Sequence, residues 1–326
     1  MDAQLTSIVH AELEGIPTEH HERVLALANA VANAVANSPQ KEAKLTPFTK
    51  MTWSEMKSAE GLHLDVRNVE LATRRAVTSL SLPPFLDSVQ PTEHLKGQLA
   101  RLERTWSRNS EAGRRTFVDA LLAEAVDTFY HGILVDERSS ESMLDSVDVE
   151  PPESGSTAPL RVFSEVEIKW SGACKGVTGN VDYLFGHADA DDVEEGMKDS
   201  FLIAVEAKKE WPDSAVRQAI AEGGVLLRYR QKNNKTGPVF VVLTNATFWV
   251  FYCIDNNGVV YSSGPEIVFG ETTLPMILRW LRWFVMAAAV TSPRASTVDM
   301  TDEEKTRVQS SLTEYCVKLW EKRSRK

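Results

Sequence analysis

The stretch FLIAVEAK, from Phe201 to Lys208, has the pattern of a β-strand that is apolar on both faces until its last residues. Side chains alternate along a strand, so Glu206 and Lys208 point to the same side. Burying either charge without a partner would cost on the order of several kcal/mol. We therefore expect this end of the strand to open to water, to a metal ion or to a network of ion pairs.

A second acidic residue lies on the preceding strand candidate, NVDYLFG, where Asp182 is flanked by apolar residues. If the two strands pair, Asp182 and Glu206 converge. Two carboxylates aimed at one point suit Mg²⁺ or Mn²⁺. Lys208 beside them could orient a water molecule or stabilise charge on a phosphate, which is the equipment for metal-assisted hydrolysis of phosphodiesters.

The surrounding pattern predicts an α/β fold in which a mixed central sheet is flanked by helices. A helical stretch from Glu93 to Leu134 should break near RNSEAGRR, where Ser110 can cap a new helix. Helical spacing also follows Pro212 and continues to about Arg230. Further strands are expected at 160–170, 239–243 and 248–254.

We divide the chain into five regions. They are a helical N-terminal region (1–95), the first core helices (96–135), an acidic loop rich in Ser and Pro (136–159), a nuclease-like α/β core (160–270) and C-terminal helices (271–326). The apolar stretch from Leu274 to Val290 contains Arg279 and Arg282, so we expect a buried amphipathic helix rather than a membrane span.

Asp182, then Glu206-Ala207-Lys208 closing an apolar strand, then a helix carrying Gln218 together resemble the PD-(D/E)XK nuclease superfamily. The resemblance covers about 111–254. It implies a restriction-endonuclease-like core with the order helix, three strands, helix, strand.

By this resemblance, Asp182 and Glu206 would hold the metal with help from the backbone carbonyl of Ala207. Lys208 would position the water, and Gln218 would be the polar residue that several branches carry on the next helix.

The first helix of that superfamily often supplies a glutamate, for which Glu111 is the first candidate and Glu124 the second. A helical region joined to such a domain is also loosely similar to nuclease-like domains of fungal proteins. Some of those accompany mobile elements or Crinkler-type effectors.

The tripeptide alone has little specificity, because Glu42-Ala-Lys44, Glu167-Ile-Lys169 and Glu303-Glu-Lys305 match it too. Glu167-Ile-Lys169 is the serious competitor because it lies on a strand. Its charges, however, follow the regular alternation of a solvated face. The alternative for the preferred site is a structural ion pair at the end of a strand.

The 326 residues carry 36 basic and 46 acidic side chains, a formal charge of −10, which excludes a globally basic coat but not a local basic groove. Lys209, Arg217, Arg228 and Arg230 are candidate contacts to nucleic acid; alternatively they form the polar face of a surface helix and its loop.

Three widely spaced cysteines and no classical signal peptide indicate an intracellular protein, in cytoplasm or nucleus. Two functions remain open. One is a Mg²⁺-dependent nuclease acting on DNA. The other is a catalytically silent nuclease-fold module that binds proteins or nucleic acid, as an effector would.

Overall fold

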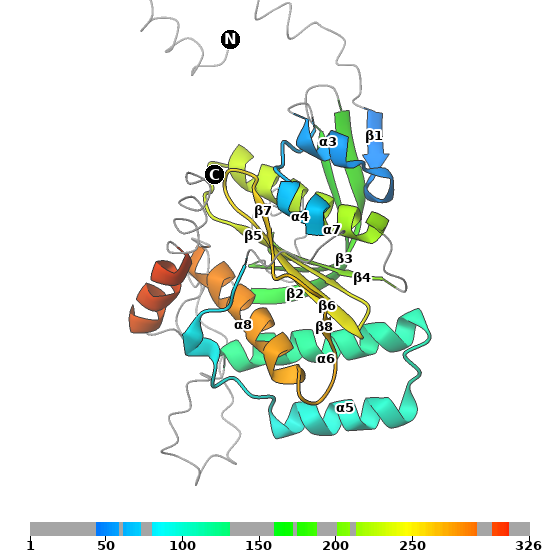
Figure 1. The fold of residues 1–326 in the computed structure, drawn as a ribbon, viewed down its shortest axis with the longest axis vertical. Coiled ribbons are helices and arrows are strands. Elements are labelled where there is room, and N and C mark those ends of the chain that lie inside the picture. Colours follow the sequence, from blue (N-terminus) through cyan, green and yellow to red (C-terminus); the bar gives the residue numbers. More distant parts are fainter. Residues whose placement is uncertain are drawn as a thin grey trace, which may run out of the picture. The chain divides into compact units, whose positions relative to one another are not determined.

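The computed structural model describes residues 44–58, 61–72, 80–130, 160–171, 175–187, 201–208, 213–291 and 302–312, all within one compact unit, Lys44–Lys326 (Figure 1). The part of the expected helical N-terminal region before residue 44, the acidic loop at 136–159 and Lys209 lie outside the described residues.

The described strands form one mixed sheet, which confirms the predicted α/β class. Strand β4 pairs with β3 antiparallel and with β5 parallel, so the sheet changes direction next to the candidate site. The strands are β1 (Lys44–Pro47), β2 (Leu160–Ser171), β3 (Lys175–His187), β4 (Phe201–Ala207), β5 (Val239–Thr244), β6 (Phe248–Ile254), β7 (Val260–Ser262) and β8 (Ile267–Val268).

Helices cover both faces of this sheet, as Figure 1 shows. One face carries α7 (Asp213–Lys232) with the short helices α3 (Trp53–Lys57) and α4 (Arg67–Ala72), and the other carries α6 (Glu111–Tyr130) and α8 (Leu274–Thr291). Helix α5 (Glu93–Thr105) packs on α6. The remaining helical segments are η2 (Phe48–Lys50), η3 (Pro84–Leu86) and 302–312.

The break between α5 and α6 falls where the sequence predicts it. Thr92 caps α5 by accepting a hydrogen bond from the Leu95 amide at 3.1 Å. Ser110 precedes α6, and its hydroxyl accepts from the Gly113 amide at 3.0 Å, as expected of a cap. The cap fixes where α6 begins, and the helix packs against β2 and β4 of the sheet.

Two parts of the fold differ from the sequence prediction. The region 1–95 is not helical throughout, because β1 pairs in parallel with the first residues of β3. Strand β3 also begins at Lys175 rather than Asn180. Glycines and proline are poor strand formers, so KLTP and KGVTG give a weak local signal that pairing in the sheet overrides.

One edge of β3 is interrupted beside the candidate site. Its other edge pairs with β2, so β1 and β4 share this edge, at Lys175–Thr178 and at Tyr183–Gly186 respectively. Residues 179–182 between them pair with neither strand. The Phe48 ring closes against Gly179, where an added Cβ would lie 2.6 Å from a ring carbon.

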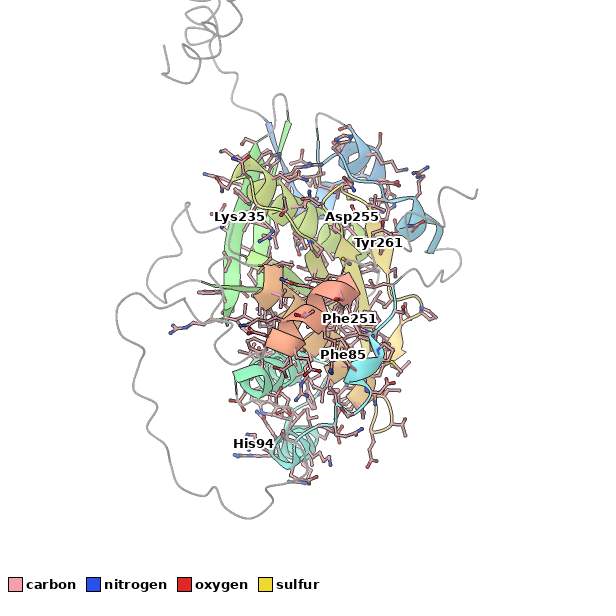
Figure 2. All side chains as sticks on the ribbon, turned by 90° about the vertical axis from the view of Figure 1, so that its left-hand side faces the viewer. Phe85, His94, Lys235, Phe251, Asp255 and Tyr261 are labelled. Carbon is pink, nitrogen blue, oxygen red and sulfur yellow. The ribbon has the colours of Figure 1, made fainter. Side chains whose placement is uncertain are left out.

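Helix α8 is a core helix of this unit. It is the described helix with the length and apolar composition of a membrane span, yet 67% of that stretch is buried inside the protein. Phe251 of β6 stacks on Trp280 at 5.4 Å between ring centroids, and Figure 2 shows Phe251 in the body of the molecule. The Arg282 Nε donates to Thr128 at 3.1 Å, so this charge is held within the protein. The expectation of a buried amphipathic helix is confirmed.

Replacing a core side chain of α8 should therefore cost much more than replacing an exposed one on the same helix. Trp283 is 1% exposed and packs edge-on against Phe85 at 6.2 Å. We expect Trp283→Ala to lower the free energy of unfolding by about 3–5 kcal/mol. Met276 is 45% exposed, so Met276→Ala should change it by about 0.5 kcal/mol or less. Urea denaturation measures both, and equal losses would contradict the core assignment.

Candidate active site

The carboxylate of Asp182 accepts a backbone hydrogen bond at the point where the ladder between β3 and β4 ends. The last paired residues are Tyr183 and Val205. Beyond them the Ala207 amide donates to Asp182 Oδ2 at 2.8 Å. A side chain thus satisfies the amide that the missing stretch of ladder would have satisfied. This bond holds Asp182 against the C-terminal end of β4, next to Glu206.

Glu206 turns from β4 toward α7 and is almost fully buried, with 1% of its side chain exposed. Its Oε1 accepts from the Gln218 side-chain amide at 2.9 Å and is in contact with the Lys208 ammonium. Its Oε2 is buried without a hydrogen-bond partner. The predicted residues Asp182, Glu206, Lys208 and Gln218 are therefore brought together at one end of β4.

A third buried carboxyl, Glu222, joins this group and was not predicted. It lies one turn after Gln218 on α7, and the same Gln218 amide donates to its Oε1 at 2.9 Å. Glu222 is 0% exposed, and its Oε2 has no hydrogen-bond partner. The sequence did contain a signal, because Gln218 and Glu222 are four apart and share a helix face. Glu222 also interrupts an otherwise small and apolar run.

Burial and mutual repulsion push the carboxyl pKa values of this group upward. Burial raises the pKa of Glu222 well above its ordinary value, and repulsion from the neighbouring Glu206 carboxylate raises it further. Burial also raises the pKa of Glu206; repulsion from Asp182 adds to this, while Lys208 opposes it. Glu222, which is fully buried, has the stronger upward shift of its pKa.

Asp182 and Lys208 lie nearer to water and respond differently. Burial raises the pKa of Asp182, although the Ala207 amide and Arg115 oppose the change. Burial alone would lower the pKa of Lys208. The surrounding carboxylates, Glu206 foremost, outweigh that effect and raise it, so the ammonium stays charged.

On the opposite side of the sheet, Arg115 of α6 approaches Asp182 and was also not predicted. Its Nη2 lies 2.7 Å from Asp182 Oδ1 and 3.3 Å from Glu111 Oε1, and its Nη1 contacts Glu165 of β2. Its Nε is buried without a hydrogen-bond partner. Glu111 and Arg115 are four apart on α6, which is the signal that sequence analysis could have used.

Glu165 has an unusual backbone. Its φ is 56°, in the left-handed region that side chains other than glycine rarely adopt. The ladder between β2 and β3 pairs residues on both sides of Glu165 and Asp182 but skips these two. Such strain persists only where surrounding contacts enforce it and is common at functional sites. Here it brings the Glu165 carboxylate to Arg115.

Neither glutamate proposed on the first helix reaches the carboxylates of the candidate site. Glu111 is 63% exposed and meets Arg115 instead. Glu124 accepts from the Thr92 amide and hydroxyl, both at 3.0 Å, and so braces the start of α5. In the competing motif, Glu167 and Lys169 are exposed on β2, as a solvated face requires.

The arginines predicted to contact nucleic acid donate hydrogen bonds to backbone carbonyls of the protein itself. Arg230 is 0% exposed and donates to the Thr236 carbonyl at 2.9 Å, so its assignment to a nucleic-acid surface is wrong. Arg228 donates to the carbonyl of Leu62, and burial lowers its pKa. Arg217 donates to the Met51 carbonyl at 3.1 Å and pairs with Asp213. These side chains fasten α7 to neighbouring loops, because carbonyl groups at loop positions need donors.

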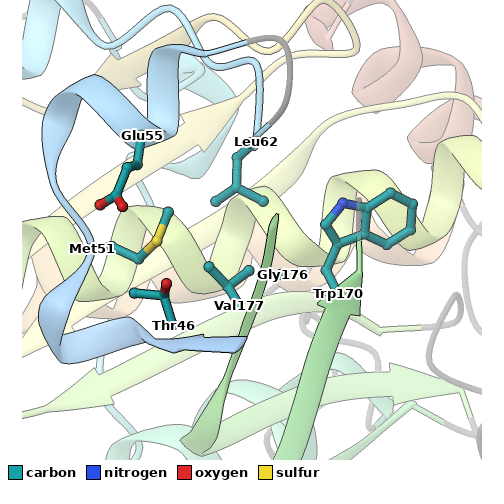
Figure 3. A pocket seen from close by; sticks show the side chains of 8 residues that line it. Thr46, Met51, Glu55, Leu62, Trp170, Gly176 and Val177 are labelled. Atoms are coloured by element: carbon teal, nitrogen blue, oxygen red, sulfur yellow. The ribbon is translucent and has the colours of Figure 1, made fainter. Parts of the chain in front are cut away.

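A pocket elsewhere in the fold contains none of the candidate site residues Asp182, Glu206, Lys208, Gln218 and Glu222. It is lined mainly by apolar side chains, among them Met51, Leu62, Trp170 and Val177 (Figure 3). Its acidic residue, Glu55, serves the capping box of α3 by accepting from the Thr52 amide at 3.0 Å. The pocket therefore offers no charged group that is free to act on a substrate.

Asp182 and Glu206 are the carboxylates that could supply oxygen ligands to a hard divalent cation. Asp182 and Glu206 come from adjacent strands, and Glu206 has an unpartnered buried oxygen. Among the described residues, no group of three or more His, Cys, Asp or Glu is arranged to hold a metal. Mg²⁺ is commonly held by one or two carboxylates, with water and substrate phosphates completing its shell, so two carboxylates are enough.

No protein-family model, curated protein or solved structure matches the chain.

The raised pKa of the buried Glu222 predicts that the free energy of unfolding falls as pH rises. A carboxyl whose folded pKa is raised binds more protons in the folded state, so its contribution is complete below its ordinary pKa of 4.5 and is lost as pH climbs through the folded value. Glu222→Gln keeps the shape and removes this titration. We expect urea unfolding between about pH 5 and 9 to show a shallower decline for Glu222→Gln than for the wild type.

Glu93→Gln, at an exposed glutamate on α5, is the control and should keep the wild-type slope. A wild-type stability that rises across this pH range would contradict the raised pKa of Glu222.

Proposed function

We propose that this protein is a divalent-metal-dependent nuclease that hydrolyses phosphodiester bonds, with DNA as its substrate. The observation that carries the proposal is the meeting of Asp182, Glu206 and Lys208 at one end of β4, where Glu206 Oε2 is buried and unpartnered. A buried carboxylate oxygen without a donor is costly unless a proton or a cation satisfies it. Such a substrate agrees with an intracellular location.

Asp182 and Glu206 would hold Mg²⁺ or Mn²⁺, together with the carbonyl of Ala207. When bound, such an ion polarises the phosphate and lowers the pKa of the attacking water. Lys208 is 32% exposed, so its ammonium is within reach of solvent and can position that water or a phosphate oxygen. Gln218 acts as a positioning residue, because its amide fixes the orientation of Glu206.

The order of elements supports a restriction-endonuclease-like core of the PD-(D/E)XK kind. Helix α6 is followed by β2, β3 and β4, then by α7 and β5, which corresponds to helix, three strands, helix, strand. The motif residues lie on β3, on β4 and immediately after it, with Gln218 on α7.

One observation favours the alternative, a catalytically silent nuclease-fold module that binds a protein or nucleic acid. Both carboxylates already have cationic neighbours, Arg115 at Asp182 and Lys208 at Glu206. Arg217, Arg228 and Arg230 of α7 also donate hydrogen bonds to carbonyl groups of the protein itself, which leaves fewer basic groups for contacts to nucleic acid. An interaction module would keep the fold and this ion network without turnover.

Cleavage assays distinguish the two functions. Plasmid DNA and RNA are incubated with the full chain in Mg²⁺, in Mn²⁺ and in excess chelator. We expect metal-dependent cleavage of DNA that Glu206→Gln and Lys208→Ala each reduce by roughly 10²-fold or more, since each removes a group from the reacting centre. Gln218→Ala should give a smaller loss.

The matched control is the exposed motif on β2, where Glu167→Gln and Lys169→Ala should leave cleavage unchanged. Activity that persists in both Glu206→Gln and Lys208→Ala would reject this site. A folded wild type that cleaves neither nucleic acid with either metal would favour the interaction module.

A further inference from the structure

The guanidinium of Arg115 lies among carboxylates from three different elements. It contacts Asp182 of β3 at 2.7 Å and Glu111 of α6 at 3.3 Å, and it also contacts Glu165 of β2. Only Asp182 belongs to the proposed metal site; the other two acids are more than half exposed at its rim. Arg115 therefore connects the site to a separate acidic rim.

Arg115 occupies the oxygen of Asp182 that faces away from β4. The other oxygen, Oδ2, already accepts from the Ala207 amide at 2.8 Å. Asp182 thus has a donor on each oxygen, whereas Glu206 keeps Oε2 unpartnered. A cation that approaches Asp182 meets a fixed positive charge at hydrogen-bond distance from the same carboxylate, and the low dielectric of a partly buried site strengthens that repulsion.

The contacts of Arg115 are not those of a closed structural ion pair. Arginine and a carboxylate frequently pair through two parallel N–H groups on the same carboxylate. Here Nη1 and Nη2 contact different acids, and the buried Nε has no hydrogen-bond partner. Glu165 meets this arginine from a left-handed backbone position with φ of 56°, a conformation that costs free energy. The rim gives the guanidinium a place to remain when Asp182 is occupied.

We propose that Arg115 is an internal counter-cation that competes with the divalent metal for Asp182. In the metal-free protein its Nη2 neutralises Asp182. Metal binding displaces that contact, while Glu165 and Glu111 retain the guanidinium. The metal affinity of the site is thereby lowered by a residue that is not a ligand. This inference rests on the proposed function, because it takes Asp182 as a metal ligand.

Metal binding to the full-length protein tests the inference without any measurement of cleavage. Titration with Mn²⁺ alone, followed by calorimetry, gives the dissociation constant of the wild type and of each variant. We expect Arg115→Met to bind Mn²⁺ about tenfold more tightly, since the competing charge is removed. Arg114→Met is the charge-matched control, at the residue that precedes Arg115 on α6. The Nε of Arg114 donates to the Arg108 carbonyl at 2.5 Å, so we expect the Arg114→Met variant to bind Mn²⁺ like the wild type.

A second pair of variants tests the rim. Glu165→Gln removes the resting place of Arg115, which should hold the guanidinium on Asp182 and weaken Mn²⁺ binding severalfold. Glu167→Gln removes an exposed charge from the same strand and should have little effect. Equal weakening by both variants would show a general field effect and would overturn the role of the rim.

The outcomes also separate this inference from the proposed function. If the wild type and Arg115→Met bind Mn²⁺ equally, the competition is disproved while the metal site stands. If folded protein binds no Mn²⁺ in either form, the metal site fails and the inference fails with it. If Arg115→Met does not fold, Arg115→Gln answers the same question, because glutamine keeps a polar side chain at this position without the competing charge. Arg115→Gln should bind Mn²⁺ more tightly than the wild type, and equal affinity would overturn the inference.

Discussion

The hydrogen bond from the Ala207 amide to the Asp182 carboxylate holds the candidate site together. It forms where β3 loses its pairing with β4, so a side chain replaces a backbone partner at that point. Because both groups are partly shielded from water, losing either would leave an unsatisfied polar atom. The bond keeps an aspartate beside the end of a strand whose penultimate residue is Glu206. Every other contact of the site is arranged around these two acids.

The site has two sides because α7 and α6 cover opposite faces of the sheet (Figure 1). On the α7 side, Gln218 bridges Glu206 and Glu222 through its amide. On the α6 side, Arg115 links Asp182 to Glu165. The α7 side encloses the buried carboxyl groups of Glu206 and Glu222, whereas the α6 side reaches the exposed Glu111 and Glu165. Buried ionisable groups seldom stabilise a protein more than apolar residues would. A cluster of such groups at one place is therefore more typical of a functional site than of a purely structural one.

Local patterns predicted much of this fold and the centre of the site. Apolar alternation predicted the strands, and helical spacing with a serine cap predicted α6. Charged residues at the end of an apolar strand predicted that Glu206 and Lys208 would lie in a network of ion pairs or at a site open to water or a metal ion. Glu222 escaped notice because an acid in an apolar helix is judged by its neighbours in space, which the sequence does not give. Arg230 was misassigned for the same reason: a basic residue near a helix end looks exposed, yet it reaches loop carbonyls inside the protein.

The amino-acid sequence alone predicted the α/β class, the strands that carry Asp182 and Glu206, and the helix that carries Gln218. It could do so because local backbone preference and the alternation of faces depend on near neighbours in the chain. The three-dimensional fold alone established which charges meet. It brought Arg115 to Asp182 across 67 residues and paired β1 with β3 across a longer separation. Contacts of this kind depend on how sheets and helices pack, and electrostatic energy depends on distance and burial, neither of which is encoded locally.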